Sequence, residues 1–290
     1  MTLQEWAVCN GEVLPAEQAM VSAFDRTLLY GLGAFETVRL YGGQPFLLER
    51  HLARLGRSLA SVGLSVPAAV QSLPADVEAL SLRAERPSAL CRITVTAGAK
   101  ASLDLPNGQP RVLVQLRDVP TRPVGRPVEV GLLPFALDAR SPLAGVKSTS
   151  YLIHYLLRER AEQEGRVDDL MIDAQGLLTE ATVSTVFVVF DGQLVTPPVE
   201  AGVLPGVTRS AVLELAEALS LPTKVGVVTE AQLATVDECF LTGAGKGLLA
   251  VDVLAGRQLS SERPFGTALA AALARRVADE CGVPVSSVVF

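Results

Sequence analysis

The segment GAFETVRLYGGQPFLLERHLARLGRSL, residues 33–59, decides the fold class because its hydrophobic period changes within one short run. Its first half predicts two strands joined at Gly42-Gly43, a pair that tolerates the positive φ of a tight hairpin turn. Its second half predicts a helix, because four leucines recur at helical spacing: Leu48, Leu52, Leu55 and Leu59. A hairpin followed directly by a helix predicts a mixed α and β fold.

The rest of the chain repeats both patterns without strict βαβ alternation, which favours an α+β fold of two domains over a doubly wound sheet. Further strands are predicted at 5–15, 89–98, 111–119, 128–137, 168–198, 223–228 and 238–254, and further helices at 75–85, 150–164, 206–221 and 262–281. The Pro- and Arg-rich stretch PTRPVGRP, residues 120–127, is typical of a linker. We therefore predict a small N-terminal domain at 1–119 and a larger C-terminal domain at 128–290.

The composition argues against several classes of protein. A net charge of −6 and a pI near 5.1 disfavour a nucleic-acid-binding protein, which normally presents a basic face. No apolar run approaches the roughly 18–20 residues that cross a bilayer, and the N-terminus lacks the pattern of a signal peptide. Two histidines, and four cysteines without a CxxC pair, disfavour a metal site or a Ser/His/Asp triad. We expect a cytoplasmic protein with no metal, nucleic-acid or membrane partner.

Two glycine-rich segments fail as nucleotide-binding loops. TGAGKGLL has Phe240 where a phosphate loop needs its first glycine, and Gly247 where that loop needs a serine or threonine. YGLGAFE has two of the three glycines of a dinucleotide-binding fingerprint, and a predicted strand follows it in place of a helix. The chemistry of this chain must therefore be sought elsewhere.

Lysine is rare in this chain, and one lysine lies between a Pro/Gly loop and an apolar-patterned helix. Lys147 occurs within DARSPLAGVKSTSYLIHYLLRER, residues 138–160. Of the 25 residues that are Lys or Arg, only four are lysines: Lys100, Lys147, Lys224 and Lys246. Lys147 is either an ordinary surface charge or a primary amine that the chemistry needs.

Three segments are suited to bind an anion. Residues 206–208 open a predicted helix, where backbone N–H groups and the positive end of the helix dipole converge. The small-residue turn TGAG at 242–245 can bring amides close to a ligand, and Arg54 can supply a bidentate cation. Each segment also has an ordinary structural reading, as a capping turn, a strand-joining loop or a helix-surface charge. Together with Lys147 they suggest a phosphate-bearing cofactor that needs an amine.

Glu180 lies between apolar residues of a predicted strand, where a carboxylate is costly unless it is paired. One reading is an edge-strand position that faces water. The other is a carboxylate that holds the protonated nitrogen of a pyridine ring, so that the ring can draw electrons from a substrate. The residues alone leave both readings open.

Five segments together resemble the fold-type IV pyridoxal-phosphate enzymes, which comprise the class IV aminotransferases and 4-amino-4-deoxychorismate lyase. The resemblance covers about residues 3–255 and implies a two-domain α+β fold, with pyridoxal 5′-phosphate at the domain interface, and a homodimer. The segments are YGLGAFETVRLYGGQPFLLERHLARL (30–55), VKSTSYL (146–152), GLLTEATVSTVF (176–187), LPGVTR (204–209) and FLTGAGKG (240–247).

The resemblance also implies a role for individual residues. Lys147 forms the Schiff base with pyridoxal phosphate, and Arg54 binds the phosphate. Glu180 pairs with the pyridine nitrogen, and Leu204 packs against the face of the ring. Further phosphate contacts, made largely through backbone amides, fall to Val207, Thr208, Ala244 and Gly245. The substrate pocket is implied to include Tyr30, Phe35 and Thr37, with Glu36 in the same segment.

Some residues depart from the family pattern or stand beside it. Thr185 and Ser150 replace asparagines, and Ala181 replaces a glycine, so the hydrogen bonds around the site are expected to differ. Lys246 either lies near the mouth of the pocket or, as we favour, is a loop charge that faces solvent. Two residues, His51 and Arg57, are expected to decorate the surface of the helix that carries Arg54.

Within the family, two features favour 4-amino-4-deoxychorismate lyase, which eliminates pyruvate to give p-aminobenzoate for folate biosynthesis. Thr37 replaces a glycine of the branched-chain enzymes, and the spacing from Lys147 to Tyr151 is one residue shorter than theirs. The alternative is a branched-chain or D-amino-acid aminotransferase that transfers an amino group to 2-oxoglutarate, since LPGVTR and TGAG suit both activities. A binding protein on a degenerate version of the fold is disfavoured, because the lysine, arginine and glutamate are all present. We predict an enzyme for a small amino substrate.

Overall fold

The computed structural model describes residues 5–100, 108–120, 126–136 and 138–290, which form two compact units. Unit 1 comprises Met1–Pro120, Val146–Tyr151 and Val277–Val288, and unit 2 comprises Thr121–Gly145, Leu152–Arg276 and Val289–Phe290. The short segment that carries Lys147 therefore belongs to unit 1. Part of the predicted linker, residues 121–125, lies outside the described residues, and the predicted domain limits stay a prediction.

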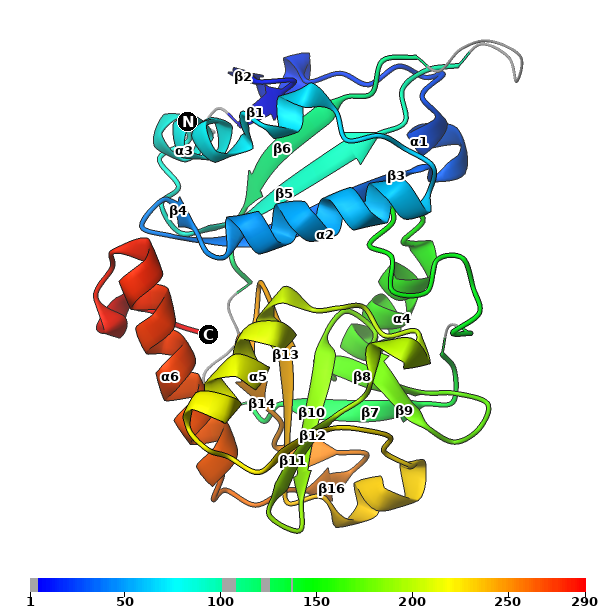
Figure 1. The fold of residues 1–290 in the computed structure, drawn as a ribbon, viewed down its shortest axis with the longest axis vertical. Coiled ribbons are helices and arrows are strands. Elements are labelled where there is room, and N and C mark those ends of the chain that lie inside the picture. The colour runs from blue at the N-terminus through cyan, green and yellow to red at the C-terminus, as the bar shows by residue number, and fades with distance from the viewer. Residues whose placement is uncertain (1–4, 101–107, 121–125, 137) are drawn as a thin grey trace. The chain divides into compact units, whose positions relative to one another are not determined.

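Unit 1 is built on one antiparallel sheet of six strands in the order β2-β1-β6-β5-β3-β4. Helix α2 lies along one face of this sheet (Figure 1). The strands are β1 (Trp6–Cys9), β2 (Glu12–Pro15), β3 (Gly33–Tyr41), β4 (Gln44–Pro45), β5 (Ala89–Thr96) and β6 (Val112–Arg117), and the helices are α1 (Arg26–Tyr30), α2 (Leu48–Ser61) and α3 (Leu73–Arg83). The predicted hairpin and helix at 33–59 are thus confirmed.

Alternation along the strands of unit 1 gives its sheet two different faces. On β5, residues 89, 91, 93 and 95 are fully buried, whereas residues 90, 92 and 94 between them are partly exposed. The buried face packs on α2 and α3 through residues that include Val38, Leu40, Leu55, Leu59, Val77, Leu80 and Ile93. We call the opposite face, which carries Phe35, Thr37, Arg92 and Thr94, the open face. The period of two therefore separates core residues from candidate site residues.

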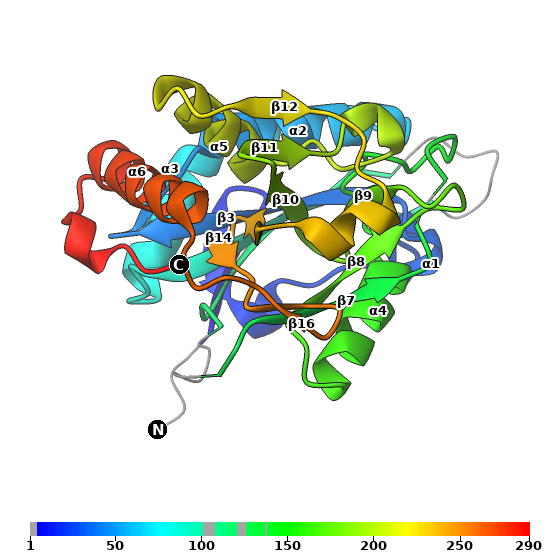
Figure 2. The same ribbon diagram turned by 90° about the horizontal axis from the view of Figure 1, so that it is seen from below.

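Unit 2 contains two five-stranded sheets whose facing residues form one hydrophobic core. Their strand orders are β12-β11-β10-β13-β14 and β16-β15-β7-β8-β9. Helix α4 lies beside β8 (Figure 2). The strands are β7 (Glu129–Leu133), β8 (Asp168–Ile172), β9 (Leu178–Ala181), β10 (Thr185–Phe190), β11 (Gln193–Thr196), β12 (Thr223–Val225), β13 (Glu238–Gly243), β14 (Gly247–Ala250), β15 (Val253–Leu254) and β16 (Arg257–Gln258), and the helices are α4 (Leu152–Gln163), α5 (Val207–Ala218) and α6 (Pro264–Cys281), which ends in unit 1.

Nearly all predicted elements are present, and the differences are short ones. The sequence did not predict α1, a five-residue helix capped by the side chain of Asp25, or the two-residue strand β16. Among the described residues, no helix combines the length and apolar character needed to span a membrane.

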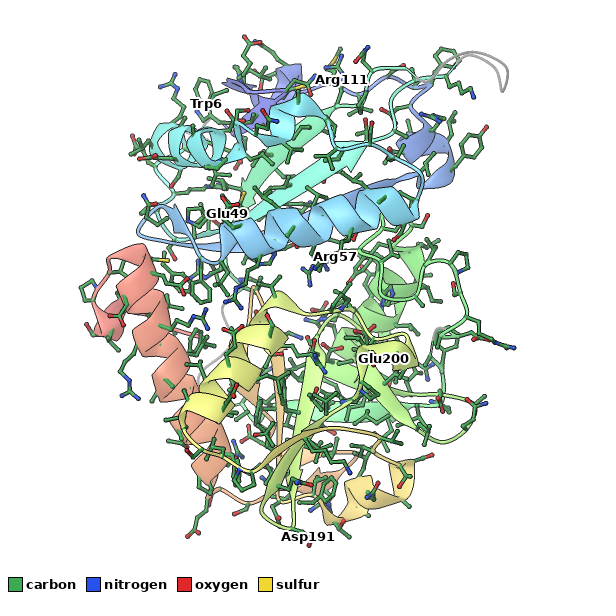
Figure 3. The ribbon with its side chains drawn as sticks, viewed as in Figure 1. Trp6, Glu49, Arg57, Arg111, Asp191 and Glu200 are labelled. Atoms are coloured by element: carbon green, nitrogen blue, oxygen red, sulfur yellow. The ribbon has the colours of Figure 1, made fainter. Side chains whose placement is uncertain are left out.

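Leu55 tests the packing of α2 on the sheet, because its side chain is fully buried in the core of unit 1. We expect Leu55→Ala to lower the free energy of unfolding by about 2–5 kcal/mol through lost contacts and a residual cavity. Trp6, the only tryptophan, packs under Arg83 of α3 (Figure 3), so its fluorescence reports the unfolding of unit 1. The control is Arg57→Ala on the exposed side of α2, expected to change stability by less than about 0.5 kcal/mol. Equal effects of both substitutions would contradict this packing.

Candidate active site

Backbone hydrogen bonds fix the segment Val146–Tyr151 against the first residues of β3. The N–H of Phe35 donates to the carbonyl of Lys147 at 3.0 Å, and the N–H of Thr149 donates to the carbonyl of Gly33 at 3.0 Å. β4 pairs only with the last residues of β3, so the edge of β3 near its start is occupied by this segment instead. The position of Lys147 in unit 1 is therefore set by the main chain of β3 and by Ser58 of α2, whose hydroxyl accepts from the N–H of Lys147 at 3.2 Å.

The end of α1 fits closely against the same segment. Gly31 ends the helix with φ of 68°, and its carbonyl accepts hydrogen bonds from the hydroxyls of Thr149 (2.6 Å) and Ser150 (3.1 Å). A Cβ at this position would overlap the Ser150 hydroxyl, so both the backbone conformation and the space require glycine. Ser150, which replaces the asparagine of the family pattern, thus anchors the lysine segment to α1.

The Lys147 side chain lies among two aromatic rings and a second cation, all in unit 1. Its Nζ is 4.6 Å from the centre of the Phe35 ring and 5.5 Å from that of Tyr151. The two rings meet edge to face at 5.1 Å, and the guanidinium of Arg92 lies 3.8 Å from the centre of the Phe35 ring. An amine and a guanidinium beside the same aromatic ring suit a ligand that needs a nucleophile and an anion contact.

The open face of the sheet extends this cationic character. Thr37 lies directly opposite Arg92 in the register of β3 and β5. Burial, together with the nearby charge of Arg117, lowers the pKa of Arg92 to about 10. The negative charge of a bound carboxylate would favour the charged form of Arg92, so this arginine is a candidate contact for an anion. Tyr30, the third residue assigned to the substrate pocket, is 72% exposed at the end of α1.

On the buried face of the same sheet, Glu36 pairs with two side chains of α2. Its Oε1 accepts from Nε of Arg54 at 2.8 Å, and its Oε2 accepts from Nη2 of Arg54 at 2.6 Å. The Nδ1 of His51 lies 2.7 Å from the same Oε2. Burial opposes the charge on Glu36, but the hydrogen bonds from Arg54 and His51 outweigh it and lower the pKa of Glu36 from 4.5 to about 2. A bidentate pair of this kind fixes the plane of the Arg54 guanidinium.

The expectation that His51 decorates the helix surface was wrong, whereas Arg57 is exposed as predicted (Figure 3). His51 is buried because it lies three residues before Arg54, on the face of α2 that meets Glu36. Burial lowers the pKa of His51, and the charges of Arg54 and Lys147 act in the same direction, although Glu36 opposes them. A neutral imidazole beside an ionised carboxylate carries its proton on Nδ1, and this N–H donates a hydrogen bond to Glu36.

Unit 2 holds the other residues assigned to the cofactor. Glu180 is half-buried at the end of β9, and its Oε2 accepts from the N–H of Leu204 at 3.2 Å, which ties the two residues together. Helix α5 begins at Val207 and Thr208, both buried, after Gly206 as N-cap. No described side chain caps this end, so its first amides and the positive end of its dipole suit an anion such as a phosphate.

Ala244 and Gly245 form the turn between β13 and β14, and both are half-buried. The hydroxyl of Thr242, at the end of β13, is buried and has no hydrogen-bond partner among the described residues. An orphaned hydroxyl beside a turn of small residues fits a bound polar group that would satisfy it. The turn therefore remains a candidate for the phosphate contacts implied by the resemblance.

The expectation that Lys246 faces solvent was wrong. Its Nζ lies 2.6 Å from Oδ2 of Asp168 and 2.6 Å from the hydroxyl of Ser184, and its side chain is only 20% exposed. The physical reason is the fully buried carboxylate of Asp168, which needs a cation nearby. Within the described residues, no group of three or more His, Cys, Asp or Glu side chains is placed to hold a metal ion.

Sequence reasoning missed Arg92 and Asp168 and misjudged the environment of Glu36. For Glu36 a signal was present, since it alternates in phase with Ala34 and Val38 and therefore belongs to the core face. His51 likewise shares a helix face with Leu48 and Leu55. For Arg92 and Asp168 the partners are distant in sequence, so no local pattern reveals them.

Glu36→Gln tests the buried pair through the pH dependence of stability. Because the folded state lowers the pKa of Glu36 from 4.5 to about 2, the carboxylate stabilises unit 1 above pH 4.5, and this contribution disappears as the pH falls toward 2. Between these pH values, the free energy of unfolding should therefore fall on the order of 3 kcal/mol further in the wild-type chain than in the Glu36→Gln variant. Urea unfolding followed by Trp6 fluorescence measures both. The control is Glu49→Gln, at an exposed position of α2 (Figure 3), which should lose as much as the wild type. Parallel curves for Glu36→Gln and wild type would exclude the pair as a source of stability.

Known proteins are similar to this chain in sequence. Residues 33–254 match the family described as amino-transferase class IV. A protein of Methanocaldococcus jannaschii, assigned as a branched-chain-amino-acid aminotransferase, is 31% identical over 260 residues that cover 88% of this chain and 89% of that protein. The aminodeoxychorismate lyase of Bacillus subtilis is 28% identical over 241 residues, which cover 81% of this chain and 82% of the lyase.

A solved structure extends this likeness to the fold. The branched-chain aminotransferase of Thermoproteus uzoniensis, determined with norvaline, has a TM-score of 0.86 at 25% identity over 96% of both chains. The chain therefore belongs to the class IV aminotransferase family and has the fold-type IV architecture.

Proposed function

We propose that this chain is a pyridoxal-phosphate-dependent 4-amino-4-deoxychorismate lyase, which releases pyruvate and leaves p-aminobenzoate. The observation that carries the proposal is the arrangement of Lys147 and Arg92 on the Phe35 ring, which offers an amine and an anion-binding group together. The substrate of the lyase has an amino group, an unsaturated ring and two carboxylates. The Arg92 guanidinium would bind a carboxylate, and the Phe35 ring would pack against the substrate ring. Lys147 would be displaced from the cofactor by the substrate amino group.

Two sets of residues would hold the cofactor. In unit 1, Lys147 would attach it covalently, and Arg54, held in its plane by Glu36, would bind the phosphate. In unit 2, Glu180 would hold the pyridine nitrogen and Leu204 would pack on the ring. The uncapped start of α5 and the orphaned hydroxyl of Thr242 fit the phosphate, together with the backbone amides of four residues: Val207, Thr208, Ala244 and Gly245.

When bound, pyridoxal phosphate supplies a ring that takes up the electron pair released at the carbon bearing the substrate amino group. Once the substrate amine has displaced it from the cofactor, Lys147 would be free to act as the base that removes the proton from this carbon. Arg92 would hold a substrate carboxylate, and the Phe35 and Tyr151 rings, which meet edge to face beside Lys147, would limit the access of water to the amine. Glu180 would keep the ring nitrogen protonated. Loss of the enolpyruvyl group as pyruvate makes the remaining ring aromatic, which favours elimination over transamination.

The choice of the lyase is supported by Thr37 on the open face, by the short spacing from Lys147 to Tyr151, and by the Bacillus subtilis relative. A branched-chain aminotransferase is the second candidate, because the Methanocaldococcus jannaschii relative is 31% identical. The two activities differ in one requirement: a transaminase needs a 2-oxo acid acceptor, and the lyase does not. We place either reaction in the cytoplasm, where the four buried cysteine thiols would stay reduced.

The acceptor requirement gives the decisive assay. With aminodeoxychorismate and no added 2-oxo acid, the enzyme loaded with pyridoxal phosphate should release pyruvate and p-aminobenzoate in equal amounts, measured by coupled NADH oxidation and fluorescence. Lys147→Ala should lose at least about 10³-fold in rate, the order expected when a covalent and proton-transferring group is removed, and borohydride should no longer fix the cofactor on the chain. The control is Lys100→Ala, which should keep both properties. Conversion of L-leucine only in the presence of 2-oxoglutarate, without pyruvate release, would replace the lyase with the transaminase.

We also propose that the chain forms a homodimer, on the evidence of exposed apolar side chains on one short helix of each unit. Several large apolar side chains that are exposed on one helix are typical of surfaces that bind another protein. Closed two-fold symmetry is the commonest way for identical chains to cover such groups. In and before α1 they are Phe24, Leu28 and Leu29, and on α4 they are Leu152, Tyr155 and Leu156.

Sedimentation measures this proposal directly. One chain has a mass of 30.5 kDa, so a dimer has twice that mass, 61 kDa. We expect the wild type to sediment as the dimer and the double variant Leu152→Lys, Leu156→Lys to sediment as the monomer. The matched control is Leu82→Lys, at an equally exposed leucine of α3, which should leave the dimer intact. A monomeric wild type, or a double variant that stays dimeric, would refute the surface.

A further inference from the structure

A buried cluster of charged and hydroxyl side chains in unit 2 lies outside the residues assigned to the cofactor. Asp168, the first residue of β8, is fully buried, and Lys246 reaches it from the turn between β13 and β14. The Nζ of Lys246 lies 2.6 Å from Oδ2 of Asp168 and 2.6 Å from the hydroxyl of Ser184. Asp168 and Lys246 are 78 positions apart in the sequence, so this contact is a feature of the fold.

The Asp168 carboxylate is the centre of the cluster. Its Oδ2 accepts from the hydroxyl of Ser184 at 2.9 Å, and its Oδ1 accepts from the N–H of Thr182 at 3.0 Å and from the Thr182 hydroxyl. Burial opposes its charge, yet Lys246 and these hydroxyls outweigh burial and keep the pKa of Asp168 below its usual value. One ionised carboxylate thus joins three segments: the start of β8, the residues just after Glu180, and the turn that carries Lys246.

The turn is packed unevenly: the ring of Phe290 occupies the place where a Cβ on Gly247 would stand, whereas the space beside Gly243 is open. None of the described atoms outside its chain neighbours lies within 4 Å of the place where a Cβ on Gly243 would stand. Within the turn, the N–H of Lys246 donates to the carbonyl of Gly243 at 3.1 Å, and Gly247 follows with φ of 56°. The charged contact between Lys246 and Asp168 therefore ties the middle of this turn to the interior of unit 2.

We propose that Lys246 is a positioning residue, which holds the amides of Ala244 and Gly245 in place for the cofactor phosphate. This role rests on the proposed function, because the phosphate contacts of Ala244 and Gly245 are themselves part of that proposal. Lys246 acts through Asp168 and Ser184, and its charge is used inside the protein. Backbone amides bind a phosphate well only when they are already oriented, since reorienting them on binding would cost free energy. The Asp168–Lys246 pair supplies that orientation.

The test compares two ligands that differ only in the phosphate. Lys246→Met keeps the length of the side chain and removes its charge and its donors. Titration of the apo protein with pyridoxal 5′-phosphate and with pyridoxal, followed by the absorbance of the bound ligand, gives both dissociation constants. We expect Lys246→Met to weaken pyridoxal phosphate at least about tenfold, which corresponds to about 1.4 kcal/mol, and pyridoxal less than about twofold. The matched control is Lys224→Met, at the exposed lysine of β12, which should change neither constant.

Lys246→Arg guards against a variant that does not fold, because it keeps a cation beside Asp168 while it changes the reach and the shape of the charged group. We expect it to bind pyridoxal phosphate with an affinity between those of the wild type and Lys246→Met. If either variant lost affinity equally for both ligands, Lys246 would only stabilise the fold in general. Unchanged affinities for both ligands would contradict any role of Lys246 in cofactor binding. A wild type that binds pyridoxal as tightly as pyridoxal phosphate would instead refute the phosphate site, which belongs to the proposed function.

Discussion

The short antiparallel contact between Val146–Tyr151 and the start of β3 is the constraint on which unit 1 depends. A lysine side chain has four rotatable bonds, so its ammonium is placed only as well as its backbone is held. Here the carbonyl of Lys147 accepts from Phe35, and the N–H of Thr149 donates to Gly33. The same pairing brings the Phe35 ring to within 4.6 Å of Nζ. The amine and its aromatic neighbour are thus placed by this backbone contact, with further anchoring of the segment to Gly31 and to Ser58 of α2.

Each unit uses a buried carboxylate to hold a cation that the resemblance assigns to phosphate binding or that lies beside residues so assigned. Glu36 holds Arg54 in unit 1, and Asp168 holds Lys246 in unit 2. The two ion pairs serve different roles because one cation is a guanidinium and the other is an ammonium. The planar guanidinium of Arg54 meets its carboxylate along one edge through two N–H groups, whereas the ammonium of Lys246 is a compact charge that serves best as a tie. The arginine is therefore suited to the phosphate, and the lysine to the turn that would bind it.

How much the sequence could predict depended on how local each signal is. The helix at Leu48–Ser61 and the hairpin before it follow from leucine spacing and a Gly-Gly turn, and both were predicted within a few residues. The segments with Lys147 and Glu180 were found because the motifs of a family are themselves local. Arg92 and Asp168 were missed because their importance arises from partners on other strands, which alternation alone does not identify. Lys246 was misread for the same reason: a glycine-rich turn predicts exposure, and only the fold shows the carboxylate beneath it.

The alternation of β3 also suggests how one fold can serve both a lyase and a transaminase. Phe35 and Thr37 point to the open face, where they meet Arg92, and Glu36 between them points to the core, where it meets Arg54. Under the proposed function, a substitution at 35 or 37 would change what a substrate meets and leave the carboxylate that orients the arginine untouched. A substitution at 36 would do the opposite, since it would strand a buried guanidinium without changing the open face. Substrate choice and cofactor support would then be carried by alternate residues of a single strand, so the first could vary while the second is kept.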